Sequence, residues 1–278
     1  MNKQIHQDNI GNAVRLSEFN TFSGVTKFSN LSAKFVMKGQ ESYTLNNKTF
    51  VVNSGEYIIG NNNNLTEVSI AENAVGLCID VSNQIITEIV SYNFENADFQ
   101  EFLFTDKFLI NKYNSKNTTL GYKLNELSKN LLHTKQDSLL GSELFYSVGE
   151  SIVFDQTIIF EQISKLNYKK QHVTEDIFRQ LLLAKNYIDD CYLNEINLEQ
   201  MIEIVFISKF AFIRLFKQTF GVTPYHYLLQ KRLDHATSLL KIGVPVFEVA
   251  QQTRFADTPS FSKAFKLCFG FPPTKIEK

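Results

Sequence analysis

One eleven-residue stretch of this 278-residue sequence recurs later in a similar form. RLFKQTFGVTP, Arg214 to Pro224, returns as KAFKLCFGFPP, Lys263 to Pro273, with phenylalanine, lysine, glycine and proline at matching steps. From two residues before each copy, a stripe recurs at i, i+3, i+4, i+7 and i+8, which is the pattern of an amphipathic helix. Its members are Phe212, Leu215, Phe216, Thr219 and Phe220 in the first copy and Phe261, Ala264, Phe265, Cys268 and Phe269 in the second. Gly221 and Gly270 are placed to end these helices as C-terminal caps. The repeat therefore predicts two short helices of the same design.

The residues before each helix extend this pattern. Ser208 and Asp257 precede the two helices at positions suited to N-caps. A short apolar segment lies upstream of each, LEQMIEIVF before the first and VFEVAQQTRF before the second. A short helix, a tight turn and a second helix form a helix-turn-helix, so the sequence predicts two of them.

The segment between the two units, from Thr223 to Lys241, has apolar residues at near-helical spacing. A helix of this length is about 27 Å long. Neighbouring major-groove faces of a DNA duplex lie about 34 Å apart. A rigid spacer of this kind is predicted to present both second helices to adjacent grooves, which explains why the unit occurs twice.

The side of each second helix opposite the phenylalanines is predicted to face DNA. Arg and Lys bond guanine, Ser and Thr bond several bases, and apolar side chains contact the thymine methyl group. In a single amphipathic helix such positions are usually ordinary solvated ones, but a basic residue at the same step of both copies favours DNA binding. The predicted DNA-binding residues are Lys209, Phe210, Ile213, Arg214, Lys217, Arg254, Thr258, Pro259, Ser262, Lys263 and Lys266.

Charge and composition agree with this interpretation. The whole chain has a net charge of −1, but residues 196–278 contain 11 basic residues against 6 acidic ones. No run approaches the roughly 18 apolar residues of a membrane span, and the first residues lack a signal-peptide core. We therefore expect a cytoplasmic protein with no membrane partner. Cys78, Cys191 and Cys268 lack paired spacing, so neither a disulfide framework nor a zinc site is expected.

Residues from about 175 to 278 resemble the DNA-binding domain of the AraC/XylS family of bacterial transcription regulators. The family pattern A-x-x-x-G-F-x-x-x-x-x-F-x-x-x-F-K-x-x-x-G-x-x-P is matched by Ala250, Phe255, Phe261, Phe265, Lys266, Gly270 and Pro273. Upstream, RLFKQTFGVTPYHYLLQKRLDHATSLL resembles the family pattern of the first unit. Two residues depart from the family: Ile202 replaces the usual alanine, and Arg254 replaces the glycine before Phe255. If that turn is left-handed, a non-glycine residue costs on the order of 1 kcal/mol.

The first half of the chain has a different pattern. From about residue 24 to 82, short alternating runs separated by turn signals predict an antiparallel sandwich or barrel. From about residue 118 the periodicity is helical, with Leu120, Leu124, Leu127 and Leu131 on one face. This leucine face is compatible with burial against the barrel or with a dimer contact. NYKKQHVTED then resembles a polar linker in which Thr174 is a candidate N-cap.

The family resemblance implies a cupin-like sensing and dimerisation domain in this first half, and it favours the leucine face as the dimer contact. The expected fold is α+β. Residues 1–168 are expected to form a cupin-like β-barrel with helices, and residues 174–278 an all-α domain with two helix-turn-helix units joined by a spacer helix.

The chemistry of the first half is less defined. No histidine occurs between His6 and His133, so we expect no cupin metal site and no cofactor. Glu41, Glu56 and Glu67 are expected to be solvated strand or turn residues. Lys34, Lys38 and Tyr43 are candidates for a ligand pocket, but alternation does not identify the inner face, so the effector site stays unassigned.

These features predict a sequence-specific DNA-binding transcription regulator that is not an enzyme. The expected partners are double-stranded DNA, a small-molecule effector, a second copy of the chain in a homodimer and, for an activator, RNA polymerase. One alternative keeps DNA binding but replaces the small-molecule effector with control by another protein. The other alternative is an enzyme in the N-terminal barrel, which the lack of metal ligands and of a nucleophile motif disfavours.

Overall fold

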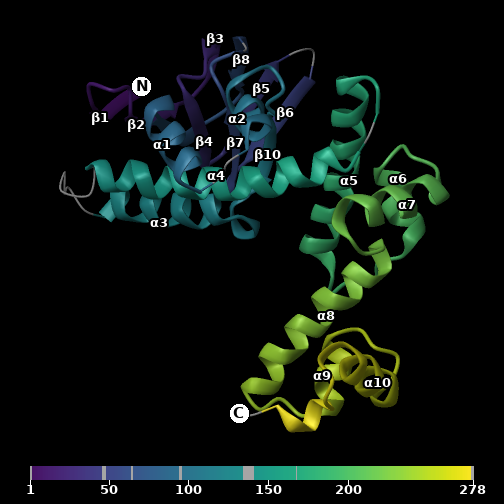
Figure 1. Cartoon of the computed structure of the whole chain (residues 1–278). Helices are drawn as coiled ribbons and strands as arrows, with labels where there is room; N and C mark the ends of the chain where they lie inside the picture. Colours follow the sequence, from purple (N-terminus) through teal and green to yellow (C-terminus); the bar gives the residue numbers. More distant parts are fainter. Residues whose placement is uncertain are drawn as a thin grey trace. The chain divides into compact units, whose positions relative to one another are not determined.

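The computed structural model describes residues 2–45, 48–63, 65–93, 96–133, 141–166 and 168–276. The chain divides into two compact units, Met1–Glu161 and Gln162–Lys278 (Figure 1). The first contains both β-sheets, and the second is helical. This arrangement confirms the α+β fold class expected from the change of periodicity.

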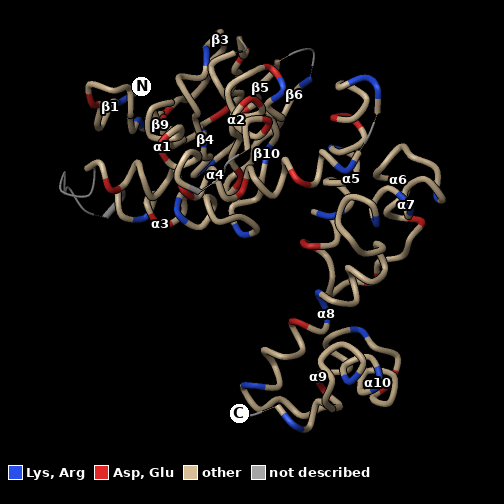
Figure 2. Tube along the Cα trace, viewed as in Figure 1, with Lys and Arg blue, Asp and Glu red and all other residues tan. Residues whose placement is uncertain are grey.

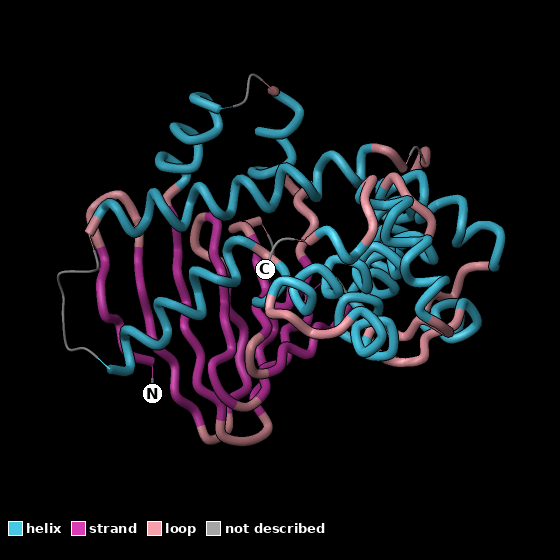
Figure 3. Tube along the Cα trace, turned by 90° about the horizontal axis from the view of Figure 1, so that it is seen from below, coloured by secondary structure: helices cyan, strands magenta, loops and turns pink. Residues whose placement is uncertain are grey.

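Two antiparallel sheets make up the β part of the first unit (Figure 3). The larger sheet has the strand order β1-β2-β9-β4-β7-β10, and the smaller has the order β3-β8-β5-β6. The strands are β1 (Asn2–Gln7), β2 (Ala13–Phe19), β3 (Phe22–Lys27), β4 (Leu31–Lys38), β5 (Gln40–Leu45), β6 (Lys48–Asn53), β7 (Glu56–Gly60), β8 (Leu65–Ile70), β9 (Ala74–Val81) and β10 (Asn111–Asn114). The predicted barrel is not closed, because each sheet keeps two edge strands.

Helices cover one face of the larger sheet. They are α1 (Asn83–Asn93), α2 (Ala97–Phe104), α3 (Thr119–His133) and α4 (Ser142–Ser164), with the short 3-10 helix η1 (Ser115–Asn117) before α3. Close packing is visible at Gly149 of α4, where an added Cβ atom meets the Ile89 side chain of α1 at 2.8 Å. The Asp155 carboxylate of α4 accepts the backbone N–H groups of Thr119 and Leu120 at the start of α3.

The leucine face of α3 is part of this packing. Leu120, Leu124 and Leu127 are buried within the unit, at 1%, 0% and 6% exposure. A surface that is already covered inside one chain cannot also meet a second copy. The prediction that this face forms the dimer contact is therefore wrong for Leu120, Leu124 and Leu127, which belong to the monomer core, whereas Leu131 is only partly buried.

Polar side chains occupy the opposite face of the larger sheet. Arg15 of β2 and Lys34 of β4 lie opposite Cys78 of β9 in the strand register, so alternation places all three on one face. Asp80, two residues after Cys78, shares that face and forms ion pairs with both Arg15 and Lys34. We call these four residues, together with Glu41 and Tyr43 of β5, the polar layer.

The smaller sheet supplies the rest of the polar layer. The Tyr43 hydroxyl donates a hydrogen bond to Glu41, and both side chains are buried. Glu41 also lies against β9 of the larger sheet, because a Cβ atom at Gly76 comes within 2.8 Å of the Glu41 Oε1 atom. The expectation that Glu41 is solvated is therefore wrong. Glu67 is exposed, and Glu56 is partly buried in an ion pair with Lys112.

The second unit contains α5 (Gln171–Cys191), α6 (Leu198–Ile204), α7 (Lys209–Phe220), α8 (Pro224–Lys241), α9 (Val246–Gln252) and α10 (Thr258–Phe269), followed by the 3-10 helix η3 (Pro273–Lys275). Helix α5 begins at Gln171, so most of the predicted polar linker is helical. Thr174 lies inside α5, and Lys170 holds the N-cap position instead. The prediction that Thr174 caps this helix is therefore wrong. The helix takes in these polar residues because its later turns bury Phe178, Leu181 and Ile188.

Candidate nucleic-acid interface

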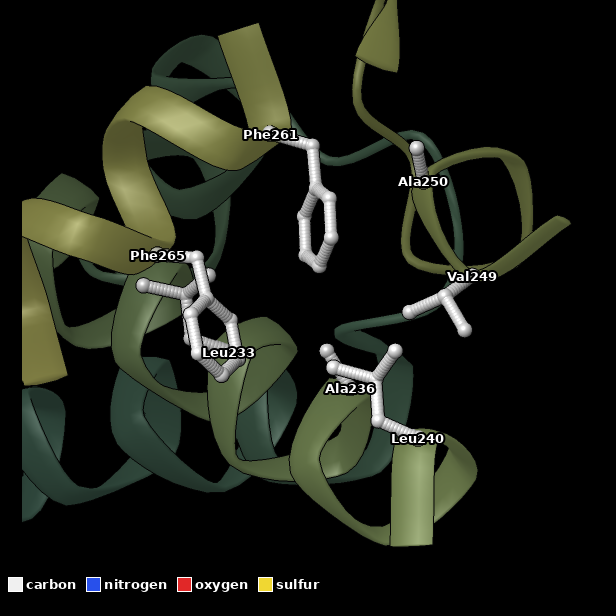
Figure 4. Close-up of a cluster of buried hydrophobic side chains, with 7 residues drawn as sticks. All are labelled: Leu233, Ala236, Leu240, Val249, Ala250, Phe261 and Phe265. Atoms are coloured by element: carbon white, nitrogen blue, oxygen red, sulfur yellow. The ribbon is translucent and has the colours of Figure 1, made fainter. Parts of the chain in front are cut away.

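Helices α7 and α10 are built to the same plan. Each has twelve residues, and each buries its phenylalanines on one side. Phe212 and Phe216 of α7 are fully buried, as are Phe261 and Phe265 of α10. Figure 4 shows Phe261 and Phe265 pointing toward Leu233, Ala236 and Leu240 of α8 and Val249 and Ala250 of α9. The buried side fixes which face of each helix is left for a partner.

The ends of both helices also match the prediction. Gly221 and Gly270 follow the helices with φ angles of 83° and 81°, in the left-handed conformation. Asp257 caps α10 through its side chain, which accepts the Ser260 N–H at 2.7 Å. Ser208 occupies the N-cap position of α7 but makes no side-chain capping bond.

The exposed side of α7 carries the residues predicted to bind DNA. Lys209, Arg214 and Lys217 are exposed, and Phe210 has 86% of its surface exposed. Ile213 is partly buried. A phenylalanine this exposed has no role in the core, so its ring is accessible to a partner.

The exposed side of α10 is similar. Pro259, Lys263 and Lys266 are exposed, whereas Thr258 and Ser262 are partly buried. Figure 2 shows lysine and arginine on both helix-turn-helix units. Both helices thus combine a buried aromatic side with an exposed side that carries cations.

Lys209 makes an ion pair outside α7. Its Nζ atom lies 3.1 Å from a carboxylate oxygen of Glu199 on α6, and both side chains are largely exposed. The hydrogen bond from Lys209 lowers the pKa of Glu199. An exposed pair of this kind contributes little to stability, so a DNA phosphate can replace the carboxylate as the partner of Lys209.

Arg254 differs from the other predicted DNA-binding residues. It lies in the turn between α9 and α10 with φ 61°, the left-handed backbone conformation expected for the glycine that it replaces. This conformation costs a non-glycine residue on the order of 1 kcal/mol. Its Nε atom donates to the backbone carbonyl of Leu193, 2.8 Å away, so the guanidinium is hydrogen-bonded to the protein although the residue is exposed.

Helix α8 forms the predicted spacer between the two units. It begins at Pro224, with the Thr223 side chain accepting the His226 N–H, and continues to Lys241. Leu228 is buried in its first half, and Leu233, Ala236 and Leu240 are buried in its second half. The second half belongs to the core of the second helix-turn-helix, so this unit is anchored on the spacer.

A buried carboxylate that sequence analysis missed joins α8 to α5. Asp189 of α5 accepts from Lys185 at 2.8 Å, from Lys231 at 2.9 Å and from the Tyr227 hydroxyl at 2.8 Å. Burial acts to raise the pKa of Asp189, but the two lysines outweigh it, so the pKa lies below its usual value. The i,i+4 spacing of Lys185 and Asp189 was visible in the sequence, but their partners on α8 were not.

Within the ranges given above, no group of three or more His, Cys, Asp or Glu side chains is arranged to hold a metal ion. None of the helices in those ranges has the length and apolar character needed to cross a membrane.

Residues 201–278 match the family described as a helix-turn-helix domain. The probable transcriptional regulator LumQ of Photobacterium leiognathi is 27% identical over 170 residues, which cover 60% of this chain and 63% of LumQ. The uncharacterized HTH-type transcriptional regulator YidL of Escherichia coli K12 is 50% identical over 66 residues, 23% of this chain and 22% of YidL. The matched stretches thus span less than two thirds of either relative.

A solved structure of a probable AraC family transcriptional regulator from Rhodopseudomonas palustris also matches. It is 23% identical, with a TM-score of 0.33, and the match covers 35% of this chain and 94% of that chain. The family match includes both predicted recognition helices and the spacer between them. Residues 201–278 of this chain therefore form a helix-turn-helix domain, and the chain is similar to transcriptional regulators that carry one.

Proposed function

We propose that this chain is a sequence-specific regulator of transcription that binds double-stranded DNA through α7 and α10. One observation carries the proposal: two helices held by the same buried phenylalanine pairs expose a cation at the same step, Arg214 in α7 and Lys263 in α10. Helix α8 joins the two units, and its 18 residues extend about 27 Å. This length suits two adjacent major grooves on one side of a duplex.

The chemistry of the exposed sides supports two kinds of contact. Arg214 and Lys263 are able to bond the O6 and N7 atoms of guanine, and Phe210 is able to contact a thymine methyl group. Lys209, Lys217 and Lys266 supply cations for phosphates, which position the protein on the duplex without reading its sequence.

The test is to select binding sequences from random duplex DNA with the full chain and to measure their affinity by fluorescence anisotropy. We expect a recurring sequence with two half-sites about one helical turn apart. Affinity should fall steeply with salt concentration, because bound lysines and arginines release counterions from the DNA. Recovery of no preferred sequence, or of affinity that does not depend on salt, would contradict the proposal.

We also propose that the two parts of the chain are separable domains, with limits at 1–168 and 174–278. The compact units Met1–Glu161 and Gln162–Lys278 lie close to these limits. Fragments that end and begin at these limits should both fold, and the second alone should bind the selected DNA, more weakly than the whole chain if the whole chain is a dimer. Specific DNA binding by the first fragment would contradict this division.

The first domain is proposed to bind a polar small molecule in the polar layer. Two buried oxygen atoms support this: Glu41 Oε1 and Thr66 Oγ1 have no hydrogen-bond partner among the residues that the structure describes. Burial raises the pKa of Glu41, although Tyr43 and Lys34 act to lower it. Buried polar atoms without partners are rare, so a ligand with hydroxyl or carboxylate groups is a suitable occupant.

A panel of sugars, amino acids and small carboxylates, screened by thermal shift on the full chain, tests this assignment. A ligand that raises the melting temperature should lose this effect in Glu41→Gln and keep it in Glu67→Gln, whose side chain is exposed on the same sheet. Equal responses of the two variants would remove the polar layer as the site. If no compound on the panel raises the melting temperature, the alternative of control by another protein is favoured.

The remaining partners follow from the proposed role. We propose a cytoplasmic protein that acts as a homodimer and, if it activates transcription, contacts RNA polymerase. Helices α3 and α4 expose Tyr122, Phe154 and Ile158, at 64%, 55% and 41% of their surfaces, which supports self-association through these two helices. Sedimentation of the full chain tests this part: a dimer that Phe154→Ser weakens is expected, and a monomer at all concentrations would refute it.

A further inference from the structure

Two arginines in the compact unit Gln162–Lys278 bind three consecutive backbone carbonyls. Arg232 of α8 donates from Nε to the carbonyl of Tyr192, 2.8 Å away, and from a terminal nitrogen to that of Asn194, 2.9 Å away. Arg254 donates from Nε to the carbonyl of Leu193, also 2.8 Å away. The segment 192–194 follows the end of α5, where unpaired carbonyls attract cations.

The three bonds connect the segment 192–194 to two later parts of the chain, the spacer helix and the second helix-turn-helix. The segment 192–194 links α5 to α6 and so belongs to the first helix-turn-helix. Arg254 lies in the turn before α10, within the second helix-turn-helix. Arg232 comes from the spacer between them. Through Arg254, the turn that leads into the second recognition helix is therefore hydrogen-bonded directly to the first helix-turn-helix.

Apolar packing does not fill the space around these bonds. An open cavity of about 780 Å³ lies beside them, lined by Arg232 and Arg254 together with Glu195, Asn197, Gln200 and Phe255 among others. The second helix-turn-helix has its own apolar core, formed by α8, α9 and α10. Its orientation relative to the first helix-turn-helix therefore depends on the course of α8 and on polar bonds across this cavity.

We propose that Arg254, with Arg232, is a positioning residue that fixes the orientation of α10 relative to α7 and so sets the spacing of the two DNA half-sites that the protein accepts. Its left-handed backbone supports this role. A glycine fits that conformation without strain but has no side chain to reach Leu193, so the strained arginine supplies a contact that glycine lacks. The effect on half-site spacing rests on the proposed function, whereas the effect on orientation does not.

Orientation can be measured without DNA. Cys268 is exposed on α10, and Glu203 is exposed on α6, so nitroxide labels at Cys268 and at Glu203→Cys report the distance between the two units. The full chain is used, with Cys78→Ala and Cys191→Ala to keep the labelling specific. Double electron–electron resonance should give a single narrow distance distribution in this parent.

Arg254→Asn is the main variant, because asparagine tolerates the left-handed backbone but is too short to span the cavity. We expect it to widen the distance distribution at least twofold while helicity stays unchanged. Arg232→Gln should act in the same direction, and Arg254→Lys, which keeps a long donor, should act less. Lys241→Ala, which removes an exposed cation from the end of α8, is the matched control and should resemble the parent. An unchanged distribution in Arg254→Asn, or equal widening in Lys241→Ala, overturns the proposal.

The second measurement uses the selected DNA with one base pair inserted between the half-sites. The parent should lose at least tenfold in affinity, and Arg254→Asn less than threefold, because a loosened second unit tolerates the new spacing. Equal losses would overturn the link to half-site spacing. If the parent binds no preferred sequence, the proposed function fails, whereas the distance measurement still decides whether Arg254 fixes the orientation.

Discussion

Arg214 of α7 and Lys263 of α10 are each the sixth residue of a twelve-residue helix, and both side chains are exposed. The fourth residue of each helix is a fully buried phenylalanine, Phe212 or Phe261, which sets the rotation of the helix about its axis. The two cations are therefore presented in the same way by two separate units.

Replacing either cation with alanine is expected to weaken binding to the selected DNA by about 1–3 kcal/mol if the side chain reads a base. Anisotropy titrations of Arg214→Ala and Lys263→Ala measure this loss, and circular dichroism checks that the helices are retained. Lys241→Ala is the matched control, because it removes an exposed cation at the end of α8. Unchanged affinity in both single variants would exclude the proposed docking of α7 and α10.

Phe261→Ala should destabilise the second unit by about 3–5 kcal/mol, because it leaves a cavity among Leu233, Val249 and Ala250. Urea unfolding followed by circular dichroism gives the change in the free energy of unfolding. Phe210→Ala is the comparison, since that ring is 86% exposed and its loss should change stability by no more than about 0.5 kcal/mol. Similar losses in the two variants would argue against the orientation of the helices described here.

Gly270→Ala should lower stability by about 1 kcal/mol, solely through the backbone conformation. A Cβ atom at Gly270 meets no heavy atom within 4 Å, so steric overlap does not contribute. Gly270→Asn should cost less, because asparagine adopts the left-handed region more readily. Thermal unfolding of the two variants measures the difference, and a larger loss in Gly270→Asn would count against a purely conformational cost.

The stability of the compact unit Gln162–Lys278 should depend on pH through Asp189. Its pKa is lowered in the folded protein, so the carboxylate stabilises the fold above the ordinary value of about 3.8. This contribution is lost as the pH falls through the folded pKa. Asp189→Asn should therefore reduce the free energy of unfolding by about 1–3 kcal/mol at pH 7, since it removes the negative charge and one of the two oxygens that accept from the lysines.

The difference between Asp189→Asn and the unaltered protein should shrink as the pH is lowered below 4. Urea unfolding at pH 7, 5 and 3 measures it. Asp234→Asn, at an exposed position of α8, is the control and should show little change. A difference that stays constant from pH 7 to pH 3 would show that Asp189 acts through packing and not through its charge.

The sequence was most informative where local rules decide the structure. The helices α7 and α10 and their glycine caps were predicted because phenylalanine spacing and Gly221 and Gly270 specify them within a few residues. The family pattern indicated Arg254 as the position where a left-handed backbone would carry a cost, and the structure has φ 61° there. The bond from Arg254 to Leu193 was not anticipated, because the two residues are brought together only by the tertiary fold.

The first half was harder to predict for a related reason. Strand β2 places Arg15 inside the fold, and Glu41 is buried on β5, so the usual alternation of buried apolar and exposed polar residues does not hold there. Whether the leucines of α3 face the monomer or a second copy depends on what lies opposite them. Periodicity identifies an apolar face, but it does not identify the partner that covers it.

The larger sheet has a consequence for how proteins of this design diversify. Its helix-covered face holds apolar side chains such as Leu77 and Ile79, which are buried at 1% and 0% exposure and stabilise the fold. Its other face holds Arg15, Lys34 and Cys78. If this second face binds the proposed ligand, substitutions there change which molecule is recognised while the first face continues to support folding. A single sheet thus separates the side chains that stabilise the fold from those proposed to contact a ligand.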